Sequence, residues 1–246
     1  MLFRHKRKQG AKTCPYCKKS ISNSAFKCTR CNRWVPCALF DRLSDSDIAL
    51  IKESDLLPMT PSLLTVMWLG LIEEMALDSS MEKALGGRLS DLQAYRVRVF
   101  QSYCYYEAAC RSARIKRGCR DSIMAVLRST LLSVIAESSA KAWKRARVGQ
   151  RDLIELLTQI GEDTYAKLAT VVEGSELGLT GRSASPTVNQ MAFSKSLSSI
   201  VLGDDHHLVV SMLLYSYLME TLWHTRSQFS RLFLVEDDDF DWQAAV

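Results

Sequence analysis

From residue 37 onward, apolar side chains recur mostly with the three- and four-residue spacing of helices, and strand patterns are scarce. Start signals support this pattern. Ser44 or Ser46 can cap a first helix, and Thr60 followed by Pro61 is a strong N-terminus for a second one. The second helix carries the apolar run LLTVMWLGLIEEMAL. Two helices are therefore predicted between residues 44 and about 78.

Further helices are predicted between breaks in the chain. Gly86 and Gly87 interrupt the pattern, and Ser90 with Gln93 then forms a capping box that starts a long helix ending near Gly118. The remaining helices are predicted at about 121–147, 151–172, 190–201 and 205–235.

These helices predict a mainly α protein in which residues 37–235 form an irregular all-α bundle of five to seven helices. A chain of 246 residues can bury one substantial core, or one core plus a small appendage. The segment 173–190 is rich in Gly and Ser and is predicted to be a mobile loop. The apolar runs at 63–72 and 208–219 are shorter than the roughly 20 residues of a membrane helix, so we expect buried helices and no membrane span.

The N-terminal segment differs from this body in charge. Residues 1–36 hold ten Lys and Arg and no Asp or Glu, a formal charge of +10, whereas the rest of the chain carries −5. Residues 1–11 are predicted to be a basic, disordered arm. A polar, cysteine-rich segment follows the arm, which excludes a secretory signal. We therefore expect a cytoplasmic protein, in a reducing compartment where paired cysteines favour a metal over a disulfide.

Four cysteines stand in two Cys-x-x-Cys pairs, Cys14 with Cys17 and Cys28 with Cys31. Two such knuckles joined by a short hairpin supply a complete tetrahedral set of thiolates for one Zn²⁺, with no open position for a catalytic water. A redox dithiol would need only one pair, inside a thioredoxin-like βαβ pattern that this sequence lacks. The spacing therefore predicts one structural Zn²⁺ that supplies most of the folding energy of a small module.

The pattern around these ligands is Cys-Pro-x-Cys, an aliphatic residue, a small residue and a second Cys-x-x-Cys. The residues that form it are Cys14, Pro15, Cys17, Ile21, Ala25, Cys28 and Cys31. In this order, residues 12–36 resemble the short zinc-ribbon module that is common at the termini of prokaryotic proteins. The usual glycine after the last cysteine is Asn32, at a position where a positive φ is often required. The resemblance implies a small β-hairpin fold and covers these residues alone.

Basic side chains in and before the module are candidates for contact with nucleic acid or with a protein partner. They are Arg4, Lys6, Arg7, Lys8, Lys18, Lys19, Lys27, Arg30 and Arg33. Trp34, with Phe26 or Tyr16, could offer a stacking face for bases. Alternatively, Trp34 packs over the zinc hairpin and the lysines only keep a small domain soluble.

The helical body offers weaker candidates. Glu220 and His224 are four residues apart on one helix face, and with Asp204 and His206 they would be the first candidates for an active site in the bundle. A surface or helix-capping role is the alternative. The sequence contains no phosphate-binding glycine loop, nucleophile elbow or HExxH motif. We therefore predict no catalytic residue.

Charge also clusters further along the chain. One cluster surrounds Lys116 and another surrounds Trp143. They could contribute to a nucleic-acid groove, but they are expected at opposite ends of the bundle, which favours the alternative that they are cations at helix C-termini. The tail at 236–246 alternates acidic residues with Phe240 and Trp242. It could dock on a basic patch of its own chain or of a partner, or serve only as a solubilising terminus.

These observations favour a non-enzymatic prokaryotic adaptor. Its zinc ribbon and basic arm would contact a protein partner or nucleic acid, while the helical body docks into a larger assembly. The alternatives are a nucleic-acid-binding regulator and an enzyme with a site inside the bundle.

Overall fold

The computed structural model describes residues 11–22, 25, 27–35, 39–74, 77–143, 149–174, 188–203 and 207–239. The chain divides into two compact units. Unit 1 comprises residues 1–61, 114–123 and 231–246, and unit 2 comprises residues 62–113 and 124–230. All of the predicted basic arm except Ala11, and residues 175–187 of the predicted mobile loop, lie outside the described residues.

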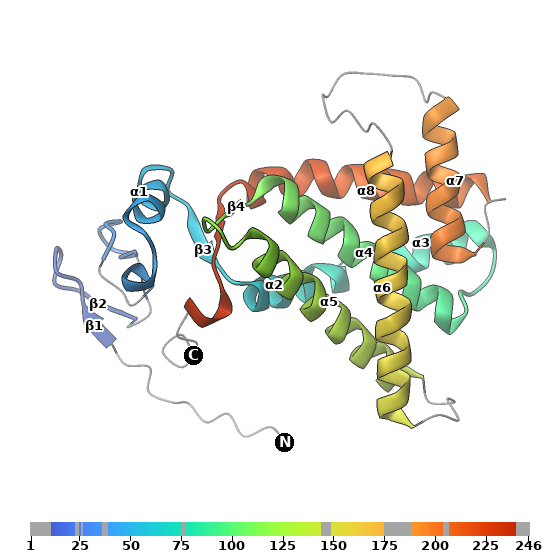
Figure 1. Cartoon of the computed structure of the whole chain (residues 1–246), viewed down its shortest axis with the longest axis horizontal. Coiled ribbons are helices and arrows are strands. Elements are labelled where there is room, and N and C mark those ends of the chain that lie inside the picture. The colour runs from blue at the N-terminus through green and yellow to red at the C-terminus, as the bar shows by residue number, and fades with distance from the viewer. Residues whose placement is uncertain are drawn as a thin grey trace. The chain divides into compact units, whose positions relative to one another are not determined.

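Unit 1 begins with the predicted N-terminal hairpin (Figure 1). Strand β1, Ala11–Thr13, pairs antiparallel with β2, Ser20–Ser22, and Lys12 lies opposite Ile21. Ile21 is the buried residue of β2. The turn between the strands contains the first cysteine pair, so the hairpin positions that pair.

A short helical segment follows the hairpin in unit 1. It consists of the 3₁₀ turn η1, Phe40–Arg42, and helix α1, Asp45–Glu53. The Ser44 hydroxyl accepts a hydrogen bond from the backbone N–H of Asp47 at 3.2 Å, so Ser44 is the N-cap. One face of α1 contributes Ile51 to an apolar cluster that also contains buried Leu39, Leu43, Leu56, Phe233 and Val235.

The rest of unit 1 is a three-stranded parallel sheet that the sequence analysis did not anticipate. Its strands are β3, Leu57–Met59, β4, Arg114–Ile115, and β5, Leu232–Leu234, in the order β3-β5-β4. All three residues of the central strand β5 are buried, as is usual in parallel sheets. Helix α8 ends at Phe229, so the predicted final helix does not extend to residue 235. The short 3₁₀ turn η2, Asp237–Asp239, follows β5.

Unit 2 is helical and confirms the predicted mainly α fold. Its helices are α2, Pro61–Glu74, α3, Leu77–Leu85, α4, Asp91–Ser112, α5, Arg120–Ala142, α6, Gln150–Gly174, α7, Val188–Leu202, and α8, Leu208–Phe229, of which α2 and α5 begin in unit 1. The predicted capping box at Ser90 and Gln93 is present. The predicted break at Gly86 is also present, with φ +67° directly after α3.

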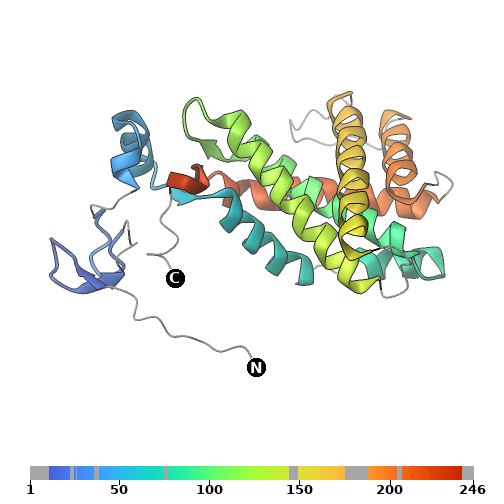
Figure 2. The same cartoon turned by 60° about the horizontal axis from the view of Figure 1, so that its bottom comes forward.

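Helix α4 is central to unit 2 and packs against α6, α7 and α8. In Figures 1 and 2, α6 and α7 lie side by side and cross α4 and α8. Aromatic rings fill the crossings. The rings of Tyr103 and Tyr165 meet edge to face with centroids 5.3 Å apart, and the rings of Phe100 and Tyr217 lie 6.0 Å apart. These ring contacts pack α4 against α6 and α8.

Helix α5 is the one helix of the described chain that is long and apolar enough to cross a membrane. Its most apolar window has a mean hydropathy of 1.3, and half of that window is buried against the rest of the protein. The buried core helix of a globular protein meets the same length and composition criteria.

Candidate metal centre

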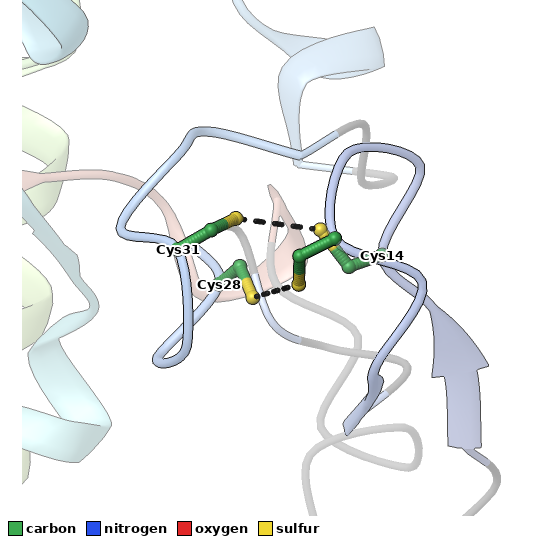
Figure 3. Close-up of side chains that lie close together, drawn as sticks. Cys14, Cys28 and Cys31 are labelled. Carbon is green, nitrogen blue, oxygen red and sulfur yellow. Dashed lines mark hydrogen bonds between the residues drawn. The ribbon is translucent and has the colours of Figure 1, made fainter.

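The two cysteine pairs come together at one point of unit 1. The Sγ atoms of Cys14 and Cys31 lie 3.7 Å apart, and so do those of Cys17 and Cys28. All four sulfurs lie within 4.8 Å of one another. Figure 3 shows the labelled side chains of Cys14, Cys28 and Cys31 converging, with the two sulfur pairs marked by dashed lines.

These distances suit a tetrahedral metal ion. Zinc–sulfur bonds are about 2.3 Å long, so the edges of a regular tetrahedron of ligands measure about 3.8 Å. The two sulfur separations of 3.7 Å match that edge. The four cysteines can therefore hold a metal ion such as zinc. Within the described ranges, no other group of three or more histidine, cysteine or acidic side chains lies close enough to do so.

The backbone gives the two knuckles the same shape. In each knuckle, the N–H four residues after the first cysteine donates to the carbonyl of that cysteine, and the cysteine N–H donates to the carbonyl five residues on. The four bonds are Lys18 to Cys14 at 3.0 Å, Cys14 to Lys19 at 2.9 Å, Asn32 to Cys28 at 2.8 Å and Cys28 to Arg33 at 2.9 Å.

Both knuckles close through a residue with positive φ, Lys18 at 59° and Asn32 at 58°. The sequence pattern indicates this conformation at Asn32. Lys18 holds the equivalent position of the first knuckle, and the sequence analysis missed it. The signal was available, because Lys18 follows Cys17 just as Asn32 follows Cys31.

Backbone N–H groups lower the pKa of Cys14 and Cys28 below the usual value and so favour their thiolate forms. The N–H of Cys17 makes the largest contribution to lowering the pKa of Cys14, which falls to about 6. The N–H groups of Cys31 and Arg30 lower the pKa of Cys28, and the Arg30 nitrogen lies 3.4 Å from the Cys28 sulfur. Knuckle amides thus compensate negative charge at the ligands.

Cys31 shows why the cluster needs a cation. The N–H of Arg33 lowers the pKa of Cys31, but burial and the sulfurs of Cys28, Cys14 and Cys17 together raise it to about 11. Four sulfurs confined this closely do not all ionise unless a positive ion compensates them. A divalent metal ion such as zinc would supply that compensation.

Little apolar surface supports the knuckles. Their buried cluster consists of Cys14, Cys28, Ile21 and Val35, and two of these four are the ligands themselves. So small a core cannot offset the entropy of ordering some 25 residues. The fold of the described part of this module therefore depends on its sulfur cluster.

The candidate contact residues fall into separate groups. Lys18, Lys19, Arg30 and Arg33 lie in or directly after the knuckles, are exposed, and form no ion pair with another described residue. The candidates Arg4, Lys6, Arg7 and Lys8 lie outside the described residues.

Lys27 and Trp34 instead contact other segments of unit 1. The Lys27 ammonium pairs with Asp55 and lies 5.2 Å from the centre of the Trp34 ring. Trp34 is half-buried, with its ring centre 6.1 Å from that of Phe40, and it packs against the apolar cluster around Ile51. These contacts attach the metal module to the remainder of unit 1.

Tyr16 is the exposed aromatic residue at the knuckles. Half of its surface, 52%, is open to solvent, and the Arg33 guanidinium lies 5.1 Å from its ring centre. Tyr16 belongs to the first knuckle and Arg33 follows the second, so this cation–π contact connects the two knuckles.

The candidate acid–base pair on α8 lies on the surface. His224 Nε2 lies 3.7 Å from Glu220 Oε1, and both side chains are about two-thirds exposed. Asp204 and His206 lie outside the described residues. The described part of this group therefore forms an exposed i,i+4 pair on one helix.

The start of the acidic tail contacts its own chain. The Lys116 ammonium lies 2.8 Å from Asp239 and 3.1 Å from Glu236, and the Arg42 guanidinium donates to the Asp238 carbonyl. These contacts correspond to one alternative from the sequence, docking of the tail on a basic patch of its own chain. Phe240 and Trp242 lie outside the described residues.

Comparison of the chain with models of protein families, with curated proteins and with solved structures found no match.

Proposed function

We propose that this protein is a non-enzymatic adaptor whose N-terminal head, residues 11–35, is a zinc ribbon that binds an anionic partner. In this proposal the helical unit 2 carries the head and docks into a larger assembly. The observation that supports it is the cluster of four sulfurs with a tetrahedral edge of 3.7 Å. Four thiolates complete the coordination of Zn²⁺, so the ion has a structural role and leaves no position for substrate.

The charge of the head supports an anionic partner. The described residues 11–35 carry six Lys and Arg and no Asp or Glu. A zinc tetrathiolate contributes −2, which leaves a formal charge of +4 on a very small module. Such a field attracts polyanions and raises their rate of association.

Metal analysis tests the first half of the proposal. Full-length protein purified under reducing conditions is expected to contain one zinc per chain and no iron, measured by elemental analysis. A tetrathiolate iron site would give a visible absorption band that zinc lacks. Protein that is folded and free of bound metal would overturn the proposed head.

Partner capture tests the second half. The full chain and its Cys28→Ser variant are used as matched baits in extract from the native host, with and without nuclease. Macromolecules that bind through the head are expected on the wild-type bait and lost from the variant, because the knuckles lose their shape. An identical set on both baits would show that the head is not the binding element.

A further inference from the structure

We propose that the tips of the two knuckles form a binding surface for single-stranded nucleic acid, with Tyr16 as the base-stacking residue. This knuckle surface consists of Tyr16, Lys18, Lys19, Arg30 and Arg33. The inference rests on the proposed adaptor function and specifies the chemistry of its anionic partner.

The cations of the knuckle surface are available to a ligand. Lys18, Lys19, Arg30 and Arg33 are all exposed. Lys27 differs from them, because Asp55 already neutralises it. The structure thus separates a paired lysine from four cations that can contact phosphates, a distinction that the charge pattern alone did not make.

The stacking group is Tyr16 and not Trp34. Trp34 packs against Phe40 and the apolar cluster, so its ring has a structural role in unit 1. Tyr16 is 52% exposed and is the one exposed aromatic residue among the described residues of unit 1. The Arg33 guanidinium lies over the ring, 5.1 Å from its centre. A base that stacks on the exposed part of Tyr16 would place its phosphate beside the Arg33 guanidinium.

This combination favours single strands over duplexes. An aromatic ring can stack only on a base that is not enclosed in a double helix, whereas a duplex offers this surface its phosphates alone. An acidic peptide would pair with the four cations but would gain nothing from Tyr16 beyond apolar contact. A loss of affinity when the Tyr16 ring is removed would therefore distinguish a single-stranded nucleic acid from a duplex or an acidic peptide.

The test measures binding of zinc-loaded full-length protein to a fluorescent oligothymidine of about 16 nucleotides, by anisotropy. Tyr16→Ala is expected to weaken binding about tenfold, because stacking on one base is lost. Tyr16→Phe keeps the ring and is expected to bind within about twofold of wild type. Each variant is first checked for one zinc per chain, so that loss of the fold is not mistaken for loss of contact.

Charge is tested with a matched pair of substitutions. The double variant Lys18→Ala/Lys19→Ala is expected to lower the slope of log affinity against log salt by about 1.4, which is about 0.7 for each phosphate contact on a single strand. Lys52→Ala is the control, because Lys52 is an exposed lysine of unit 1 that lies over Phe40, outside the knuckle surface. It is expected to leave both the affinity and the salt slope unchanged.

Two results would overturn the inference. One is a duplex of the same length that binds as tightly as the single strand, with Tyr16→Ala equal to wild type. The other is no measurable binding to the oligonucleotide, or its equal displacement by polyglutamate. The adaptor proposal would survive either result if the head binds zinc and captures a nuclease-resistant partner, so the two failures are distinguishable.

Discussion

The two units of this chain are stabilised by different kinds of interaction. Unit 1 contains strands of two or three residues, two small apolar clusters, a group of four sulfurs and ion pairs between distant segments. Unit 2 contains long helices with Tyr95, Phe100 and Tyr103 almost fully buried. Unit 1 thus has little apolar core beside its sulfur cluster and ion pairs, whereas unit 2 is stabilised mainly by burial of apolar side chains.

This difference explains why local sequence patterns did not predict the strands of the unit 1 sheet. Its sheet brings together β3, β4 and β5, which lie near residues 58, 115 and 233 of the chain. None of the three strands is long enough to be stable alone. β3 and β4 each form their strand hydrogen bonds with β5, a distant segment of the chain, whereas each helix of unit 2 has its own internal hydrogen bonds.

The largest expected effect comes from removing a metal ligand. Cys28→Ser should unfold residues 11–35, because binding of structural zinc contributes about 10–16 kcal/mol and few apolar contacts remain. Helicity of unit 2 should persist, since its core does not depend on the cluster. Two-dimensional NMR spectra and far-ultraviolet circular dichroism of the full chain measure the two effects separately.

Cys110→Ser is the control for this substitution, because Cys110 is a half-buried cysteine on α4 of unit 2. It should leave the metal content and the signals of residues 11–35 unchanged. Loss of unit 2 helicity together with the metal would contradict the contrast drawn between the units.

The features that sequence reasoning identified are those encoded locally. The Ser44 cap, the Ser90 capping box and the Gly86 break each depend on residues within one helical turn. The meeting of the four cysteines followed from their spacing, because a Cys-x-x-Cys knuckle allows few other arrangements.

The features that it missed depend on distant partners. The apolar run Leu232–Val235 fits a helix as well as a strand, and only its pairing with β3 and β4 decides between them. The sequence also did not predict that Lys27 is paired while Lys18 is exposed, because nothing near Lys27 in the sequence indicates that Asp55 will neutralise it. Pairing across 28 residues is not visible in a charge pattern.

A smaller effect is expected from crowding the core of unit 2. A Cβ atom at Gly161 on α6 would lie 2.7 Å from the Tyr95 hydroxyl and 2.9 Å from a methyl carbon of Leu132. Both side chains are buried, and the Tyr95 hydroxyl donates to the Leu157 carbonyl, so neither moves without loss. Gly161→Ala should destabilise unit 2 by about 1–2 kcal/mol, the cost of overpacking less the gain in helix propensity. Urea denaturation followed by circular dichroism measures this change.

Gly70→Ala is the matched control on α2, because no atom lies within 4 Å of the Cβ position there. It should stabilise the protein by about 0.5–1 kcal/mol through helix propensity alone. Neither glycine substitution should alter the metal content of residues 11–35. If Gly161→Ala proved as stabilising as Gly70→Ala, the core around Gly161 would not be tightly packed.

The smallest effect concerns the ion pairs that join the strands of unit 1. Lys116 follows β4, and its backbone N–H donates to the Leu234 carbonyl while its ammonium contacts Glu236 and Asp239. Lys116→Met keeps the length of the side chain and removes the charge. It should destabilise the sheet by about 1 kcal/mol at pH 7, because Asp239 is buried and loses its cation, whereas Glu236 is partly exposed and screened by water.

The pH dependence of the same ion pairs sharpens the test. The hydrogen bond from Lys116 lowers the pKa of Glu236 below its usual 4.5, so this pair stabilises the folded state above that pH and is lost on acidification. Burial alone would lower the pKa of Lys116, but hydrogen bonds to Asp239 and Glu236 raise it above 10.5, so its contribution is complete at neutral pH. Urea denaturation followed by NMR signals of β5 should show the advantage of wild type over Lys116→Met becoming smaller as the pH falls from 7 to about 3, by the part that the Glu236 pair contributes. The exposed control Lys52→Met should follow wild type, and an advantage that is as large at pH 3 as at pH 7 would show that the ion pair with Glu236 does not stabilise the folded protein.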